Sequence, residues 1–277
     1  SYGIEEQYIT GDASGYEKFK AYASMMPACI GNPLYHWSHL ELRRYFGIEE
    51  TLSDKTADTI WHRANERIHA GGFTPRGLIE KSNVAALCTT DDPADTLEYH
   101  QLLKAEKGFN CRVLPAFRPD KALGIEQPGF PDWISVMEQT AGEGIGSFAT
   151  LCEVIKKRIA FFDSLGCRAS DHALEYVMCV PETDENLEKI FAKRLRGERI
   201  SREEEMKFKT AFMLFVAGEY ARLGWTMQLH YGCKRDNNTA MYHLLGPDTG
   251  FDCINNYAPS AQLADFLDLL NREGSLP

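Results

Sequence analysis

Short apolar runs alternate with helical stretches over most of the chain. Four runs are strand candidates, because each is short, apolar in character and followed by polar residues. They cover residues 84–89, 111–116, 166–170 and 225–232. Strands that alternate with helices indicate β-α units on a parallel sheet, so the pattern predicts an α/β fold.

The first part of the chain has a different pattern. Residues 1–72 show helical spacing and no strand signal. Ser14 and Ser38 each stand three residues before a glutamate, which is the capping-box signature of a helix start, and Ser201 repeats it later in the chain. We therefore predict a helical insertion or cap over residues 1–72 and a partial barrel segment over residues 73–277.

Polar residues come directly after all four predicted strands. Crossovers between parallel strands are right-handed, so the carboxyl ends of the strands should meet at one rim, where such folds keep their sites. Four strands are too few to close an eight-stranded barrel. The residues expected at the rim are Asp91, Asp92, Arg118, Asp120, Asp171, His172 and His230.

Composition narrows the class of protein. The 277 residues carry a net charge of −10 with no basic stripe, which argues against a nucleic-acid binder. Eight scattered cysteines without a C-x-x-C pattern indicate a reducing compartment, and no apolar run approaches a membrane span. Neither a dinucleotide-binding nor a phosphate-loop motif is present. We expect a soluble cytoplasmic protein.

Arg118 stands between an aromatic residue and a proline at a strand end. A guanidinium group has a fixed fork of donors that suits a carboxylate, so Arg118 is a candidate clamp for an acidic small molecule. A structural ion pair with Asp120 explains the same spacing equally well.

Histidines supply the candidate acid–base groups. Asp171 and His172 could form an acid–base pair, or His172 could pack in the core while Asp171 caps a helix. His230 comes directly after an apolar strand, where it could be a rim or core histidine or a metal ligand.

Two further clusters suit a polar ligand. His36 shares a helix face with His39, and Trp37 beside it is either core or faces a sugar. Asn237 and Asn238 offer amide donors and acceptors for hydroxyl groups, although asparagines are also common in turns.

Five motifs, in chain order, resemble uronate isomerase (glucuronate isomerase), a family of the amidohydrolase superfamily. The likeness extends over essentially the whole chain. The motifs are NPLYHWSHLEL (32–42), TTDDP (89–93), LPAFRPDK (114–121), SDHAL (170–174) and LLGPDTGFD (244–252).

The resemblance implies a (β/α)8 TIM-like barrel of the metal-dependent hydrolase type with a helical insertion. It also implies an aldose–ketose isomerase that converts D-glucuronate to D-fructuronate and D-galacturonate to D-tagaturonate. By this likeness Arg118 holds the substrate carboxylate and His230 contacts the substrate. The expected catalytic residues are His230, Asp171 and His172. The expected substrate-binding residues are Arg118, His36, Trp37, Asp120, Asn237 and Asn238.

The chain departs from the family at the metal site. The family's divalent metal, usually zinc, rests on an H-x-H pair of the first strand and an aspartate of the eighth. No H-x-H occurs in this sequence, so we expect no metal ligands on this chain and zinc only in a full-length enzyme. We therefore interpret the chain as an incomplete barrel, the middle of a longer enzyme, and expect it to be inactive alone.

Two other functions fit the sequence. One is a truncated, non-catalytic module that binds sugar acids, and the other is a metal-dependent hydrolase of the same superfamily. The expected partner in each case is a small molecule, a hexuronate for the isomerase. Neither nucleic acid nor a membrane is expected as a partner, and homo-oligomerisation stays open.

Overall fold

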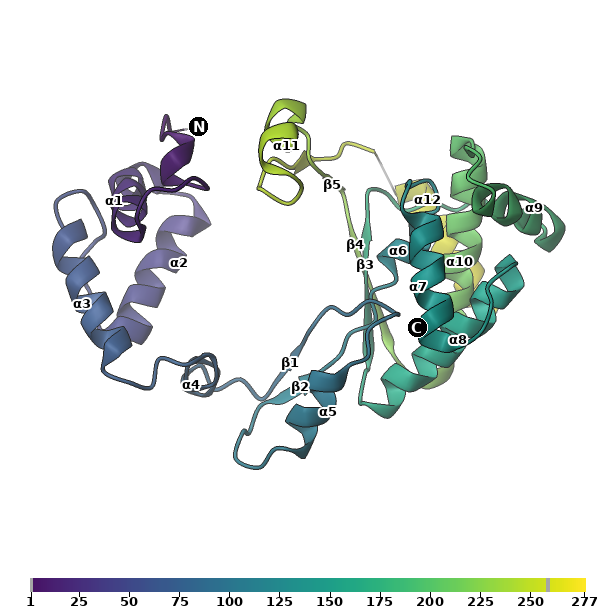
Figure 1. The fold of residues 1–277 in the computed structure, drawn as a ribbon, viewed down its shortest axis with the longest axis horizontal. Helices are drawn as coiled ribbons and strands as arrows, with labels where there is room; N and C mark the ends of the chain where they lie inside the picture. Colours follow the sequence, from purple (N-terminus) through teal and green to yellow (C-terminus); the bar gives the residue numbers. More distant parts are fainter. Residues whose placement is uncertain (1, 258–259) are drawn as a thin grey trace. The chain divides into compact units, whose positions relative to one another are not determined.

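A computed structural model describes residues 2–257 and 260–277. The chain forms two compact units, one of Ser1–Ala85 with Phe109–Cys111 and one of Ala86–Gly108 with Arg112–Pro277 (Figure 1). Each unit has its own set of helices, and the strands β1 to β6 belong to the second. The predicted domain boundary after residue 72 stays a prediction.

The first unit is helical around its own small core. The Ser14 capping box is confirmed: the serine side chain accepts the Glu17 N–H, and the Glu17 carboxylate accepts the Ser14 N–H. Ala23, Met26 and Ile60 are among the fully buried residues that hold the helices together. The elements of the unit are η1 (Glu6–Tyr8), α1 (Gly15–Met25), η2 (Met26–Cys29), α2 (Pro33–Glu41), η3 (Leu42–Phe46), α3 (Ala57–His69) and α4 (Pro75–Lys81).

The predicted helix start at Ser38 is wrong. Helix α2 begins five residues earlier, because the Asn32 side chain accepts the Leu34 N–H and Pro33 occupies the first helical position. Ser38 lies inside the helix, where its hydroxyl bonds to the Leu34 carbonyl four residues back. The stronger cap upstream therefore overrides the local capping-box pattern.

The second unit is an α/β arrangement with a strand at each of the four predicted places, although the strand predicted over residues 166–170 begins at Ala169 and continues through Asp171 and His172 to Leu174. The four strands are β1 (Ala86–Cys88), β2 (Arg112–Leu114), β3 (Ala169–Leu174) and β4 (Thr226–Tyr231). The main helices are α5 (Glu98–Ala105), α6 (Asp120–Leu123), α7 (Phe130–Ala141), α8 (Phe148–Ser164), α9 (Asp184–Leu195), α10 (Arg202–Leu223) and α12 (Ser260–Arg272).

All four strands run parallel, as predicted. β1 pairs with β2 and β3 pairs with β4, with Asp171 opposite Gln228 and Ala173 opposite His230. Phe117, just beyond β2, makes parallel bridges to Asp91 on one side and to Ser170 on the other. The strands therefore lie side by side in chain order, and their carboxyl ends share one rim.

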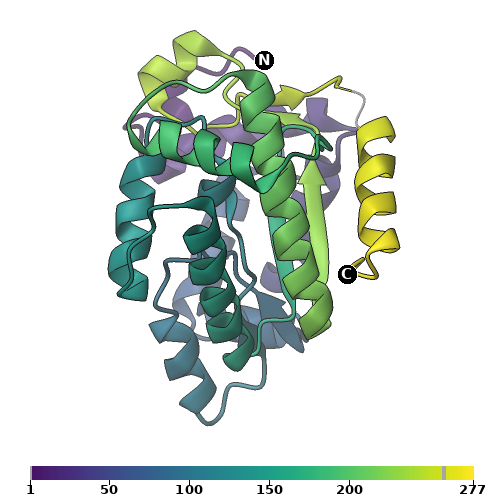
Figure 2. The same cartoon turned by 90° about the vertical axis from the view of Figure 1, so that its right-hand side faces the viewer.

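Strands β3 and β4 have two unlike faces. On the covered face, which consists of Ser170, His172, Leu174, Met227 and Leu229, the apolar side chains join the core that α8, α9 and α10 complete (Figure 2). The polar face consists of Asp171, Ala173, Thr226, Gln228 and His230, and all three of its β4 members are exposed. The period of two along a strand produces this division.

A small lobe comes after β4. Gly232, with φ of +90°, turns the chain into β5 (Cys233–Lys234), which pairs antiparallel with β6 (Cys253–Ile254). Helix α11 (Thr239–Leu245) lies between these two strands. Among the helices of the described residues, none is both long and apolar enough to cross a bilayer.

Candidate functional site

Arg118 reaches the rim because the residue before it is locked in the core. Phe117 is fully buried, with its ring 5.0 Å from that of Phe162 and 6.3 Å from that of Trp225. Arg118 comes next at the strand end, where its backbone N–H donates to the Asp91 backbone carbonyl at 2.9 Å. Successive side chains of an extended chain point to opposite sides, so the buried Phe117 directs Arg118 away from the core.

Two carboxylates hold the Arg118 guanidinium. Its Nε–H donates to Asp120 Oδ2 at 2.6 Å, and its Nη1 lies 3.3 Å from Asp171 Oδ2. The ion pair with Asp120 that the sequence left open is therefore present. Asp120 also accepts the Ala173 N–H at 3.1 Å through Oδ1, which ties the segment after β2 to strand β3.

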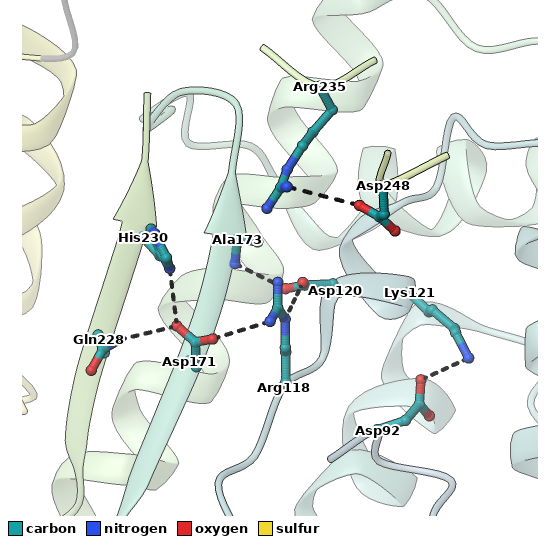
Figure 3. A network of polar contacts seen from close by, with 10 residues as sticks. All are labelled: Asp92, Arg118, Asp120, Lys121, Asp171, Ala173, Gln228, His230, Arg235 and Asp248. Atoms are coloured by element: carbon teal, nitrogen blue, oxygen red, sulfur yellow. Dashed lines mark hydrogen bonds and ion pairs between the residues drawn. The ribbon is translucent and has the colours of Figure 1, made fainter. Parts of the chain in front are cut away.

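Asp171 connects Arg118 to strand β4 (Figure 3). Its Oδ1 accepts a hydrogen bond from Gln228 Nε2 at 3.3 Å and lies 3.9 Å from His230 Nδ1. The register of β3 and β4 brings these residues together from positions more than fifty residues apart. The structure thus pairs Asp171 with His230, not with its sequence neighbour His172.

A cavity of about 420 Å³ lies beside this cluster; Asp120 and His230 line it, whereas Arg118 and Asp171 do not. The His230 side chain is 68% exposed, so a ligand can reach its ring. The lining includes Asp120, Glu175, Lys209, His230, Lys234 and Arg235. Lys209 bonds Glu205 at 2.6 Å and Glu126 at 2.9 Å, and is engaged within the protein.

The close contact of charged groups in the cluster, and their partial burial, shift the pKa values of Arg118 and Asp120. The hydrogen bond to Asp120 raises the pKa of Arg118, so this side chain stays charged at any pH of interest. Partial burial raises the pKa of Asp120, and the Arg118 guanidinium opposes that rise. The arrangement therefore holds one guanidinium between two carboxylates, with an accessible imidazole beside them.

The prediction that His172 faces the pocket is wrong. His172 is fully buried on the covered face, where its Nε2 lies 3.1 Å from Ser170 Oγ and its ring lies 5.8 Å from that of Tyr220. Burial lowers its pKa to about 3, so it is neutral at physiological pH. The physical reason is alternation along β3, which turns Asp171 to one face and His172 to the other. The packing alternative is the one that the structure shows.

Asp91 and Asp92 use their carboxylates within the protein. Asp91 Oδ2 accepts the Thr89 hydroxyl at 2.6 Å, and the same hydroxyl lies 2.8 Å from His100 Nε2 on α5. Asp92 Oδ1 accepts Trp133 Nε1–H at 3.1 Å. Both aspartates therefore brace the rim, and neither lines the cavity beside His230.

The two asparagines lie in the lobe after β4. Asn238 caps helix α11, since its side chain accepts the Met241 N–H at 3.2 Å. The Asn237 N–H donates to the Phe251 carbonyl at 2.7 Å. Neither residue lines the cavity beside His230, and their contact with a ligand stays a prediction.

His36 and Trp37 belong to helix α2 of the first unit. His36 lines a cavity of about 510 Å³ there, together with His39. Trp37 is 63% exposed, which excludes the core interpretation. The two ring nitrogens of His39 contact the Tyr35 carbonyl and the Leu52 N–H, so His39 is structural. The ligand-binding roles of His36 and Trp37 stay predictions.

Sequence reasoning missed the roles of Gln228 and Arg235. Gln228 lies two residues before His230 and so on the same face, a signal that the period of two already carried. Arg235 lines the cavity and its Nη1 lies 3.0 Å from Asp252 Oδ2, a pairing across the β5–β6 ladder. No local motif reports that contact.

The cluster does not suit a metal ion. Within residues 2–257 and 260–277, no three His, Cys, Asp or Glu side chains are grouped so that they could hold one. Asp120 and Asp171, the nearest carboxylates, share a guanidinium whose positive charge would repel a divalent cation. The roles assigned to this cluster are therefore those of its own side chains.

Parallel strands with a polar cavity at their carboxyl ends define an α/β protein of the kind that binds small molecules at this rim. Residues 1–277 match the glucuronate isomerase family over their full length, and the chain belongs to that family. Uronate isomerases of Endomicrobium trichonymphae and Clostridium acetobutylicum are each 54% identical to it over 277 residues. The family resemblance seen in the sequence is thus confirmed.

Solved structures support the same fold. A uronate isomerase from Thermotoga maritima matches 99% of the chain with a TM-score of 0.92 and 32% identity. A glucuronate isomerase from Caulobacter crescentus matches 97% of it with a TM-score of 0.88 and 24% identity, which bears on the fold alone. The chain spans 59% of the length of the Endomicrobium and Clostridium relatives and 60% and 57% of these two structures.

Proposed function

We propose that this chain is part of a uronate isomerase, which interconverts D-glucuronate with D-fructuronate and D-galacturonate with D-tagaturonate. The observation that carries the proposal is the family match over all 277 residues, at 54% identity to uronate isomerases. The reaction moves a proton between C2 and C1 of a hexuronate, so it needs a base beside C2 and a fixed grip on the substrate.

Each role falls to a group of the polar cluster. Arg118 binds the hexuronate carboxylate, because it is the cation held at the centre of the cluster. His230 takes the proton from C2 and returns it to C1, while the hydroxyl proton passes from O2 to O1. Asp171, 3.9 Å from Nδ1, orients the ring and stabilises its charged form. The exposed His230 ring beside the cavity supports this assignment.

The finer fold is that of an incomplete (β/α)8 barrel. The parallel order of β1 to β4 and the exposed β4 residues of the polar face support it, because that face is the one a closed barrel would turn inward. A divalent metal, zinc by family resemblance, belongs to the full-length enzyme. Metal analysis of the longer polypeptide by mass spectrometry tests this, and a preparation that is active and free of metal would contradict it.

The direct test uses two proteins: the 277-residue chain, and the polypeptide of its relatives' length encoded by the same reading frame. Proton NMR follows loss of the D-glucuronate anomeric signals. We expect conversion by the longer protein and none by the 277-residue chain alone. Failure of the longer protein with zinc supplied would remove the isomerase assignment. Turnover by the short chain would remove only its proposed inactivity.

Arg118→Ala in the longer enzyme tests the carboxylate contact. Loss of one charge-assisted contact should weaken hexuronate binding by about 1.5–3 kcal/mol. The readout is KM for D-glucuronate, with Arg168→Ala as the control, since the Arg168 guanidinium bonds Asp163 and Arg168 precedes β3, at the end of the strand opposite to the rim. Unchanged KM and kcat in Arg118→Ala would remove this role for Arg118.

A further inference from the structure

The Arg118 guanidinium is engaged on two of its three nitrogens. Asp120 holds Nε at 2.6 Å and Asp171 lies 3.3 Å from Nη1. Among the residues that the structure describes, Nη2 has no protein partner within hydrogen-bonding distance. A guanidinium grips a carboxylate with two nitrogens, Nε with Nη2 or Nη1 with Nη2. Asp120 holds the single hydrogen of Nε, which closes the Nε–Nη2 edge to a ligand, while Nη1 has two hydrogens and pairs with Asp171 at the longer distance.

Asp120 is itself engaged through both of its oxygens. Oδ2 accepts from Arg118, and Oδ1 accepts the Ala173 N–H of β3 at 3.1 Å. The carboxylate thus joins the start of α6, the segment after β2 and strand β3 at one point. A second carboxylate, that of a hexuronate, would be repelled by Asp120 if the two came into contact. These contacts argue against the direct binding of that ligand group by Asp120.

We propose that Asp120 is a positioning residue, which fixes the Arg118 guanidinium so that Nη2 meets the carboxylate of the hexuronate. The inference rests on the proposed function. The ligand contact is then made at Nη2 and not through the Nε–Nη2 edge of the fork, because Asp120 occupies the Nε hydrogen. Asp171 steadies the other end of the group, and its removal would also release Gln228. Asp120 is therefore the cleaner residue to vary.

A matched control lies elsewhere in the same unit. Arg196 Nε donates to Glu198 Oε1 at 2.6 Å, and these residues are also two positions apart. Both side chains of that pair are at least half exposed, and neither lines the cavity beside His230. Glu198→Gln thus removes an equivalent ion pair without touching the site.

The first measurement is independent of activity. The ¹⁵N-labelled 277-residue chain is used, and the Arg118 Nε–H signal is assigned by its loss in Arg118→Lys. The Nε hydrogen should exchange slowly with solvent because Asp120 accepts its hydrogen bond. Asp120→Asn should shift this signal and speed its exchange at least tenfold, while Glu198→Gln should leave it unchanged. An Arg118 signal that is the same in the parent and in Asp120→Asn would overturn the proposal.

The second measurement is kinetic and uses the longer enzyme. Asp120→Asn should raise KM for D-glucuronate about tenfold with kcat within about threefold, and in an Arg118→Ala background it should change KM less than about twofold. An equal effect in both backgrounds would mean that Asp120 acts without Arg118, and would also overturn the proposal. If Asp120→Asn does not fold, Asp120→Glu, which moves the charge by one methylene, replaces it in both measurements.

The two measurements separate the inference from the function on which it rests. Absence of isomerase activity in the parent enzyme would refute the proposed function. The NMR result would still decide whether Asp120 positions Arg118.

Discussion

The covered and polar faces of strands β3 and β4 carry similar residue types with opposite outcomes. His172 and Ser170 lie fully buried against helix α10, while His230 and Gln228 remain open to solvent. Both faces contain a histidine, so residue type alone does not mark a site. The two histidines differ in burial: one is neutral and locked in the core, and the other is accessible beside a carboxylate.

The largest effect should come from Phe117, which belongs to the same hydrophobic core as the apolar residues of the covered face. Phe117→Ala removes a fully buried ring from contact with Phe162 and Trp225, and should cost about 3–5 kcal/mol in the free energy of unfolding. Urea denaturation followed by circular dichroism measures it. Tyr99→Ala, at a side chain 71% exposed, is the control and should cost less than about 0.5 kcal/mol. Equal costs would remove the contrast between core and surface.

The next effect is the pH dependence of the covered face. The pKa of His172 is about 3 in the folded protein, so below pH 6.5 the unfolded chain binds a proton that the folded chain does not. Stability should therefore fall as pH drops, by about 2 kcal/mol from pH 7 to pH 5.

The measurement for His172 is urea unfolding at both pH values, in the parent and in His172→Phe. In the variant, the free energy of unfolding should fall less between pH 7 and pH 5, because the contribution of His172 is gone. This holds even if the substitution itself changes the stability. A parent and variant with the same difference between pH 7 and pH 5 would contradict the burial of a neutral His172.

The smallest effect belongs to the polar face. Gln228→Ala removes one hydrogen bond to Asp171 at an exposed position, and should cost about 0.5–1 kcal/mol. Its neighbour Leu229 turns to the core, so Leu229→Ala should cost about 2 kcal/mol. Urea denaturation of the two variants side by side makes the comparison. A larger loss of stability in Gln228→Ala than in Leu229→Ala would contradict the assignment of Gln228 to the polar face and of Leu229 to the covered face.

Local sequence signals identified the strands and several site residues for a simple reason. Arg118, Asp120 and His230 lie at or just beyond the ends of apolar strands, and parallel strands bring the residues at their carboxyl ends to one rim. The Asp171–His230 pairing depends on the register of β3 and β4, which no local pattern encodes. His172 was misplaced because adjacent strand residues face opposite ways, and the sequence did not say which face the helices cover.

The bridging position of Phe117 has a consequence for how the site moves. Its carbonyl accepts the Asp171 N–H at 3.0 Å, and its own N–H donates to the Ala169 carbonyl at 3.1 Å. These two backbone hydrogen bonds, together with the buried Phe117 ring, join the β1–β2 pair to the β3–β4 pair. The Asp171 amide should consequently resist deuterium labelling until the whole unit opens. Arg118 and Asp171 then move as one rigid unit, and thermal fluctuation of either strand pair does not change the distance between them.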